Sequence, residues 1–184
     1  KLAKEFKIHS NQSIILYVGS GYKRKGVYEL LKILSQLSNN NFVAFIIGKE
    51  KKYKYFQKLI KAFSLEGKVQ ILGVRKDVAD FYVASDIFIL PSKYEPFGNV
   101  VLEAMSYGNV VFASKRTGAS ELLKEEFRMD ESNESSIIKK IDNYLINPNL
   151  MIEEKQKNLS IAMQYSIERN QLETLEAIKL SQND

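Results

Sequence analysis

The chain has 184 residues, of which 45% are hydrophobic and 27% charged, the balance of a folded globular domain. Its longest apolar runs fall far short of the roughly 20 residues that a membrane-spanning helix needs. The lack of cysteine excludes disulfides and thiolate metal sites, and a single histidine, His9, leaves little scope for a histidine triad or a zinc centre. The net charge of +5 favours anionic partners, but the lysines are dispersed, so no nucleic-acid partner is expected.

Short apolar runs typical of buried strands alternate along the chain with segments of helical periodicity. The predicted strands are 14–18, 42–48, 69–73, 87–90 and 110–114, and the predicted helices are 26–37, 53–63, 78–84, 99–108 and 119–124. Continuous apolar strands separated by helices predict a parallel sheet that is covered on both faces. We therefore expect an α/β fold with a doubly wound, Rossmann-like parallel sheet.

The strand signals stop at about residue 135. Three helical segments are expected beyond it, at 135–146, 150–165 and 167–180, with a break at Pro148. The prediction is a single domain over 1–184, with an α/β core at 1–134 and a C-terminal helical tail at 135–184.

Four loops follow the predicted strands, where an open parallel sheet binds its ligands. The first of them, 19–26, has Gly19, Gly21 and Gly26 and three consecutive basic residues before a helix. Glycine lets backbone amides approach a ligand, and a helix N-terminus carries partial positive charge, so this loop suits a diphosphate. It lacks both the dinucleotide and the P-loop spacing, and a tight turn with exposed lysines is an equally good interpretation.

The stretch 95–103 holds two glutamates, Glu95 on a loop and Glu103 inside the following helix. Pro96 restrains Glu95 to an extended conformation, and Gly98 and Asn99 are expected to open the helix. Each carboxylate can accept two hydrogen bonds, which suits the vicinal hydroxyls of a sugar. The alternative is that both glutamates simply face solvent.

The stretch LPSKYEPFGNVVLEAMSYGNVVFASKRTGASELL resembles the signature of retaining, GT-B-fold glycosyltransferases of family 4, whose hallmark is two glutamates separated by seven residues. The similarity extends to YVGSGYKRKG, FIIGKE, VQILGVRKDVADFYVASDIFILPS and YSIERNQLETLEAI, in the same order along the chain. The residues of these motifs are similar to those of the lipopolysaccharide-core glucosyltransferase branch. The resemblance implies that the chain is the C-terminal, donor-binding half of a GT-B enzyme, without its N-terminal acceptor domain.

The resemblance implies a role for each residue of the expected site. Glu95 contacts hydroxyls of the donor sugar, Glu103 holds the ribose hydroxyls, and Lys25 neutralises the diphosphate leaving group. Members commonly have arginine directly after the first glycine, where this chain has Ser20, so Arg24 is expected to supply that charge. The catalytic set is thus Glu95, Lys25 and Arg24. The further donor-binding residues are the loop of Gly19, Ser20 and Gly21; Val74 and Arg75 at the nucleobase; Phe97, Gly98 and Asn99 at the sugar and diphosphate; and Val100 near the nucleoside.

The implied reaction moves a sugar from a nucleotide diphosphate, with UDP expected, to an acceptor hydroxyl with retention of configuration and without a metal or other cofactor. The expected partners are the donor and a glycan or lipid-linked acceptor held by the missing domain, in surface glycan or lipopolysaccharide synthesis. The expected location is the cytoplasm, with peripheral association at the inner face of the membrane. Two alternatives stay open, a non-catalytic nucleotide-sugar-binding module and a GT-B sugar-nucleotide epimerase.

Overall fold

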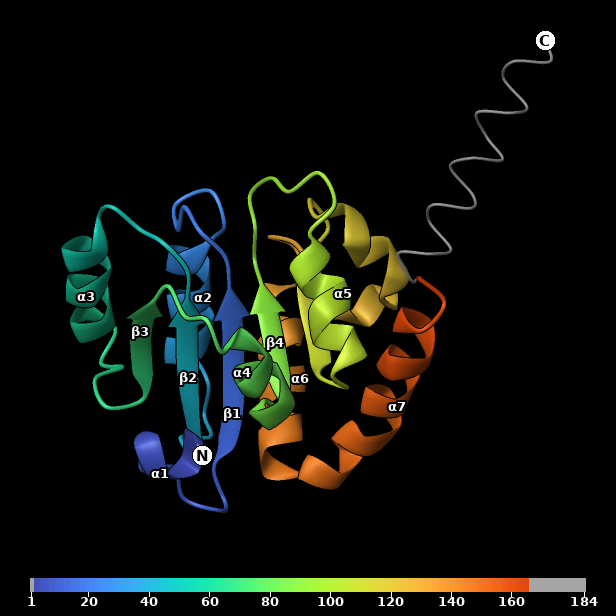
Figure 1. Ribbon diagram of the computed structural model, residues 1–184, viewed down its shortest axis with the longest axis horizontal. Helices are drawn as coiled ribbons and strands as arrows, with labels where there is room; N and C mark the ends of the chain where they lie inside the picture. The colour runs from blue at the N-terminus through green and yellow to red at the C-terminus, as the bar shows by residue number, and fades with distance from the viewer. Residues whose placement is uncertain (1, 166–184) are drawn as a thin grey trace, which may run out of the picture.

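The structure is a computed structural model, and it describes residues 2–165 of the chain (Figure 1). Its sheet has six parallel strands in the order β3-β2-β1-β4-β5-β6. The strands are β1 (Ser13–Val18), β2 (Phe42–Ile47), β3 (Val69–Gly73), β4 (Ile87–Leu90), β5 (Val110–Ser114) and β6 (Arg128–Met129). The α-helices are α1 (Leu2–Glu5), α2 (Val27–Ser35), α3 (Tyr53–Ala62), α4 (Val78–Ala84), α5 (Asn99–Ser106), α6 (Glu134–Ile146) and α7 (Met151–Ala162). Three 3₁₀ turns complete the elements: η1 (Gly118–Leu122), η2 (Glu125–Phe127) and η3 (Pro148–Leu150).

Helices cover both faces of the sheet. Figure 1 shows α2 and α6 behind the sheet and α4 and α5 in front of it, with α7 beside α5. Because each strand is covered on both sides, it must be apolar along its whole length rather than in alternation. All residues of β2, β4 and β5 are accordingly buried. No helix within residues 2–165 is both long and apolar enough to cross a membrane.

The structure confirms the α/β class, the parallel sheet and its doubly wound arrangement. Some local predictions are wrong. Between the helix expected at 119–124 and the tail expected from 135, where no element was predicted, the structure has η2 and the two-residue strand β6. The buried side chains of Phe127 and Met129 provide too short an apolar signal to recognise. The helix expected at 119–124 is the 3₁₀ turn η1, because Gly118 packs directly against the carbonyl of Pro96.

Two of the three expected tail helices lie within the described residues. α6 and α7 correspond to the first two, and the third, 167–180, lies outside the described residues together with most of the C-terminal stretch of similarity. Apolar residues of α6 belong to the same buried core as the sheet: Ile137, Ile138, Ile141, Tyr144 and Leu145. The described part of the tail therefore packs as part of the α/β unit.

The order of the sheet reverses between β1 and β4, which lie side by side although 68 residues separate the end of β1 at Val18 from the start of β4 at Ile87. The chain runs from β1 to one side through α2 and from β4 to the other side through α5. The loops that leave the carboxyl ends of β1 and β4 therefore lead to opposite faces of the sheet, and open α/β sheets bind ligands at such a switch point.

Candidate functional site

The loops after β1 and β4 touch at the switch point of the sheet. Gly26, which precedes α2, has φ 77°, and a Cβ atom there would lie 1.8 Å from the carbonyl oxygen of Pro91. The backbone N–H of Lys93 donates to the carbonyl of Arg24 at 2.9 Å. Only glycine permits so close an approach, so Gly26 fixes the basic loop 23–25 against the loop that carries Glu95.

Both basic residues expected at the diphosphate lie on the carboxylate of Glu95. Lys25 Nζ forms an ion pair with Glu95 Oε2, and Arg24 Nη1 lies 3.2 Å from the same oxygen. The side chain of Lys25 is 11% exposed and that of Glu95 14%, whereas that of Arg24 is 51% exposed. The structure thus brings the three expected catalytic residues together, with Lys25 held the more firmly of the two cations.

A buried phenol lies beneath the glycine loop. A Cβ atom on Gly19 would lie 3.1 Å from the hydroxyl of Tyr17 and 3.5 Å from Cδ of Lys25, so the absence of a side chain at Gly19 lets these groups pack closely. The Tyr17 hydroxyl is fully buried, and among the described residues it has no hydrogen-bond partner. Burial, followed by the nearby hydroxyl of Tyr22, raises the pKa of Tyr17 well above its ordinary value, so this group stays protonated.

The loop after β5 supports the loop that carries Glu95. Glu95 is extended and forms a bridge with Thr117, as its position before Pro96 predicts, and its backbone carbonyl accepts from the N–H of Gly118 at 3.1 Å. The carbonyl of Phe97 accepts from the N–H of Ala119 at 2.7 Å. These bonds fix the path of residues 95–97 and so the direction of the Glu95 side chain.

Helix α5 begins where the sequence predicts. Gly98 has φ 91° and precedes the first helical residue, Asn99, and no side chain caps the N-terminus of the helix. A Cβ atom on Gly98 would lie 2.7 Å from Cγ2 of Thr117, so a larger residue would displace the loop. Phe97 and Asn99 are exposed and Val100 is half-buried, which leaves the start of the helix accessible to an anion.

Glu103 lies on the same helix, past its first turn, and its carboxylate is exposed. The hydroxyl of Tyr82 in α4 donates to Oε2 of Glu103 at 2.9 Å. Tyr107 stacks on the Tyr82 ring with centroids 5.5 Å apart and planes within 2° of parallel. The sequence did not indicate a role for Tyr82, because spacing along the chain does not show which side chain of α4 meets Glu103.

The remaining residues of the glycine loop have structural contacts of their own. The Ser20 hydroxyl accepts a hydrogen bond from the N–H of Lys49 at 2.9 Å, which ties the loop to the one after β2. Gly21 has φ 76°, and its carbonyl accepts from the N–H groups of Arg24 and Lys25. Ser20 therefore braces the glycine loop against the segment that follows β2.

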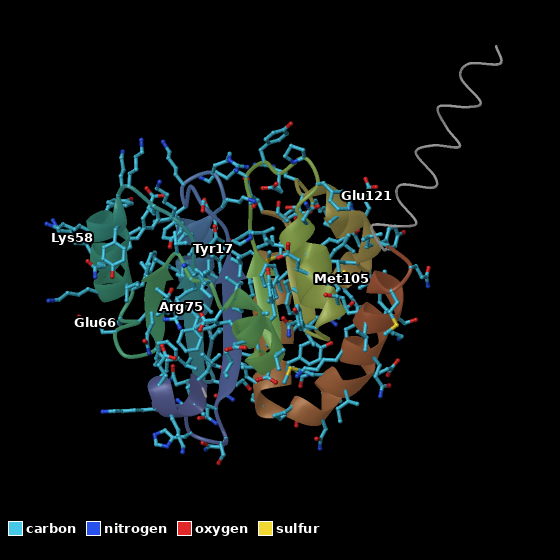
Figure 2. The ribbon with its side chains drawn as sticks, viewed as in Figure 1. Tyr17, Lys58, Glu66, Arg75, Met105 and Glu121 are labelled. Carbon is cyan, nitrogen blue, oxygen red and sulfur yellow. The ribbon has the colours of Figure 1, made fainter. Side chains whose placement is uncertain are left out.

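Val74 and Arg75, the two residues expected at the nucleobase, have different surroundings. Val74 is 72% exposed and is open to a ligand. The guanidinium of Arg75 is paired with Asp77 at 2.8 Å and with Glu5 of α1 at 3.2 Å, and it lies over the ring of Phe81. Figure 2 shows Arg75 nearer than Tyr17 to the amino-terminal ends of the strands, so its charge is engaged away from the Lys25 cluster.

A cavity of about 210 Å³ lies between α2, α6 and the loops after β4 and β5, on the other side of the sheet from α5. Its cations are paired with neighbouring carboxylates: Lys93 with Glu29, Lys115 with Asp130, and Arg116 with Glu131. None of the expected donor residues lines it. We therefore place the candidate site at the loops after β1 and β4 and at the start of α5, and not in this cavity.

Metal ligands do not gather at the site. Among the described residues, no group of three or more His, Cys, Asp or Glu side chains could hold a metal ion. His9 is exposed, and its backbone N–H donates to the side chain of Gln12. The charged groups at the site are the Lys25, Arg24 and Glu95 cluster and the separate carboxylate of Glu103.

The model of the family described as glycosyl transferases group 1 matches residues 1–164. An uncharacterized glycosyltransferase of Haemophilus influenzae is 29% identical over 161 residues, which cover 84% of this chain and 46% of the relative. The lipopolysaccharide glucosyltransferase WaaG of Escherichia coli is 28% identical over 139 residues, which cover 69% of this chain and 37% of the relative. The crystal structure of HepE from Anabaena in complex with UDP-glucose has a TM-score of 0.81 and 26% identity, and the match covers 96% of this chain and 51% of that chain.

The chain thus spans about half or less of the length of the relatives it matches. Its architecture is that of one half of a GT-B fold, in agreement with the prediction from the sequence. The family model matches well over half of the chain and includes every residue of the candidate site. This chain belongs to the glycosyl transferases group 1 family.

Proposed function

We propose that this chain is the donor-binding half of a retaining glycosyltransferase of family 4, which moves a sugar from a nucleotide diphosphate to an acceptor hydroxyl. The observation that carries the proposal is the cluster of Lys25, Arg24 and Glu95 at the switch point, next to the uncapped start of α5. A diphosphate placed there meets two cations and the positive end of a helix, which stabilise the charge that develops as the leaving group departs.

In this proposal each end of the site holds a different part of the donor. Exposed Val74 offers an apolar contact to a nucleobase, and the exposed carboxylate of Glu103 offers acceptors to ribose hydroxyls. Phe97, Gly98 and Asn99 bring backbone amides toward the diphosphate and the sugar. Glu95 accepts hydrogen bonds from hydroxyls of the transferred sugar. The engagement of Arg75 with Asp77 and Glu5 makes Val74, and not Arg75, the base contact of this proposal.

UDP is the proposed nucleotide, since a structural neighbour at 26% identity holds UDP-glucose. Synthesis of a surface glycan such as lipopolysaccharide is the proposed setting, supported by the similarity to WaaG. The acceptor, a glycan or a lipid-linked glycan, would bind mainly to the half that this chain lacks. We further propose that the protein acts in the cytoplasm, that the net charge of +5 favours association with an anionic membrane surface, and that transfer needs no metal.

Titration calorimetry of this chain with UDP, ADP, GDP and uridine tests the binding half of the proposal. We expect weak but measurable UDP binding, tighter than that of the other nucleotides, and unchanged by excess EDTA. Failure to bind any nucleoside diphosphate would contradict the proposed site. Tighter binding of ADP or GDP would reassign the nucleotide, and loss of binding in EDTA would contradict metal independence.

Product analysis with the full-length protein separates transfer from the alternatives. Incubation with a UDP-sugar and a glycan acceptor should give a new glycosidic bond whose anomeric configuration, read by NMR coupling constants, equals that of the donor. Conversion of the UDP-sugar to its epimer would identify a GT-B epimerase. Binding without any product would favour a non-catalytic module. The chain of 184 residues by itself is expected to transfer nothing, because the second wall of the cleft is not part of it.

A further inference from the structure

The carboxylate of Glu103 is exposed, yet it is held by a buried group. Tyr82 is 2% exposed, and its hydroxyl donates to Oε2 of Glu103 at 2.9 Å. Within the described part of the chain, Oε1 of Glu103 has no hydrogen-bond partner. One oxygen of the carboxylate is therefore fixed from within the protein, and the other is left to accept a hydrogen bond from outside.

The Tyr82 ring is itself held on several sides. It stacks on Tyr107 and packs at 5.9 Å against the ring of Phe88 in β4. The side-chain amide of Asn109 donates to the backbone carbonyl of Tyr82 at 2.9 Å, and it is buried where it does so. A ring locked by packing and by its backbone presents its hydroxyl in one direction, so Glu103 is held in one rotamer.

Burial, followed by the negative charge of Glu103, raises the pKa of Tyr82 far above its ordinary value. The hydroxyl therefore stays protonated, and able to donate, to higher pH than an ordinary tyrosine. Because the proton of this hydroxyl is donated to Oε2 of Glu103, Tyr82 orients the carboxylate.

We propose that Tyr82 is a positioning residue for ribose recognition: it holds Oε2 of Glu103 so that Oε1 points at a ribose hydroxyl of the donor. This inference rests on the proposed function of the site. It also explains how the base and ribose contacts keep their spacing, because Val74 and Tyr82 belong to one short segment that leads from the loop after β3 into α4. A movement of α4 would shift the base contact and Glu103 together.

The test compares two ligands on each variant: UDP and 2′,3′-dideoxyuridine 5′-diphosphate, which lacks both ribose hydroxyls. The quantity measured is the ratio of their dissociation constants, which does not change if part of a preparation is unfolded. We expect the parent chain to bind the dideoxy compound about tenfold more weakly than UDP, the value of one charge-assisted hydrogen bond. Glu103→Gln should bring the ratio close to 1.

Tyr82→Phe removes the hydroxyl and keeps the ring, and it should lower the ratio to about 2–3, because the carboxylate is no longer held in one rotamer. Tyr107→Phe is the matched control, since it keeps the stacked ring and leaves the hydrogen bond from Tyr82 to Glu103 in place. It should retain the ratio of the parent. Urea denaturation of each variant shows whether the fold is intact.

The outcomes separate this inference from the proposed function. If the parent chain fails to bind UDP, or binds both compounds equally, the proposed donor site fails and the inference fails with it. If Glu103→Gln lowers the ratio but Tyr82→Phe leaves it unchanged, the donor site stands and the role of Tyr82 is overturned. An equal loss in Tyr107→Phe would also overturn it, because the effect would then come from the packing of the rings.

Discussion

Lys25 and Glu95 form an ion pair that joins the two loops diverging from β1 and β4. The Glu95 carboxylate thus already pairs with the Lys25 cation that a diphosphate would approach. Arg24 pairs with the same oxygen of Glu95. Binding of a diphosphate must redistribute these charges, since the phosphates and Glu95 are both negative. Glu95 therefore holds Lys25 and Arg24 in place in the structure, and it would compete with a bound diphosphate for both of them.

Replacement of Lys25 by methionine should weaken UDP binding while sparing uridine. Methionine keeps an apolar stem against Gly19 and removes only the charge, so the loss should be that of a charge-assisted hydrogen bond, roughly 1.5–3 kcal/mol. Arg24→Met should lose less, because the Arg24 side chain is half exposed. Calorimetry with UDP and uridine measures both effects. Lys23→Met, at an exposed neighbour, is the control, and an equal loss of uridine affinity would argue against a phosphate clamp.

Replacement of Glu95 by glutamine should have opposite effects on binding and on turnover. Removal of the negative charge frees Lys25 and Arg24 for the diphosphate, so we expect UDP to bind more tightly, by about 0.5–1 kcal/mol at low salt. In the full-length protein, turnover of the UDP-sugar should fall, because Glu95 no longer accepts the sugar hydroxyls as the bond breaks. Unchanged UDP affinity at both low and high salt would show that the ion pair does not compete with the phosphates.

The close contact between Gly26 and Pro91 predicts a stability difference between two glycine substitutions. Gly26 and Gly67 both have positive φ, but a Cβ atom would strike Pro91 at the first and meet nothing within 4 Å at the second. Gly67→Ala should cost only the conformational strain of alanine in this region, about 1–2 kcal/mol. Gly26→Ala should cost clearly more, measured by urea denaturation. Equal losses would mean that the two loops move apart easily.

The buried tyrosines predict a loss of stability at alkaline pH. Burial and the negative charge of Glu154 raise the pKa of Tyr144 to about 12. A tyrosine with a raised folded-state pKa contributes fully below its unfolded value of about 10, and the contribution is lost as pH rises from about 10 to 12. The free energy of unfolding should therefore fall across this window, as urea titrations at successive pH values would show. Tyr144→Phe should reduce the slope, and an unchanged slope would contradict the assignment.

The sequence predicted the sheet well because β2, β4 and β5 are continuous apolar runs that are buried at every residue, and β1 is largely buried. β6 escaped prediction, since Arg128–Met129 is too short to show a pattern and its second residue is buried only through tertiary packing. The turn η1 was predicted as a helix from the periodicity of its side chains. That periodicity does not show that Gly118 passes close to the carbonyl of Pro96. Local patterns thus determine the elements, and close approaches between loops determine their details.

The loops of the site were predicted from the rule that ligands bind at the carboxyl ends of strands. That rule places residues 19–26 and 95–103 at one edge of the sheet, but it does not say which side chains pair. The contact of Glu95 with Lys25, the engagement of Arg75 by Glu5, and the hydrogen bond from Tyr82 to Glu103 depend on side-chain directions that only the three-dimensional arrangement fixes.

A buried relay of amides links helix α7 to this site. The side chain of Asn158 donates to the backbone carbonyl of Asn109 at 2.8 Å, and the Asn109 side chain in turn holds the carbonyls of Tyr82 and Ser85. Removal of α7 would leave Asn109 without this bond and open the side of α5 to water. The smallest piece of this chain expected to keep the candidate site intact therefore extends through α7, which makes this helix a structural part of the sheet domain and not an appendage to it.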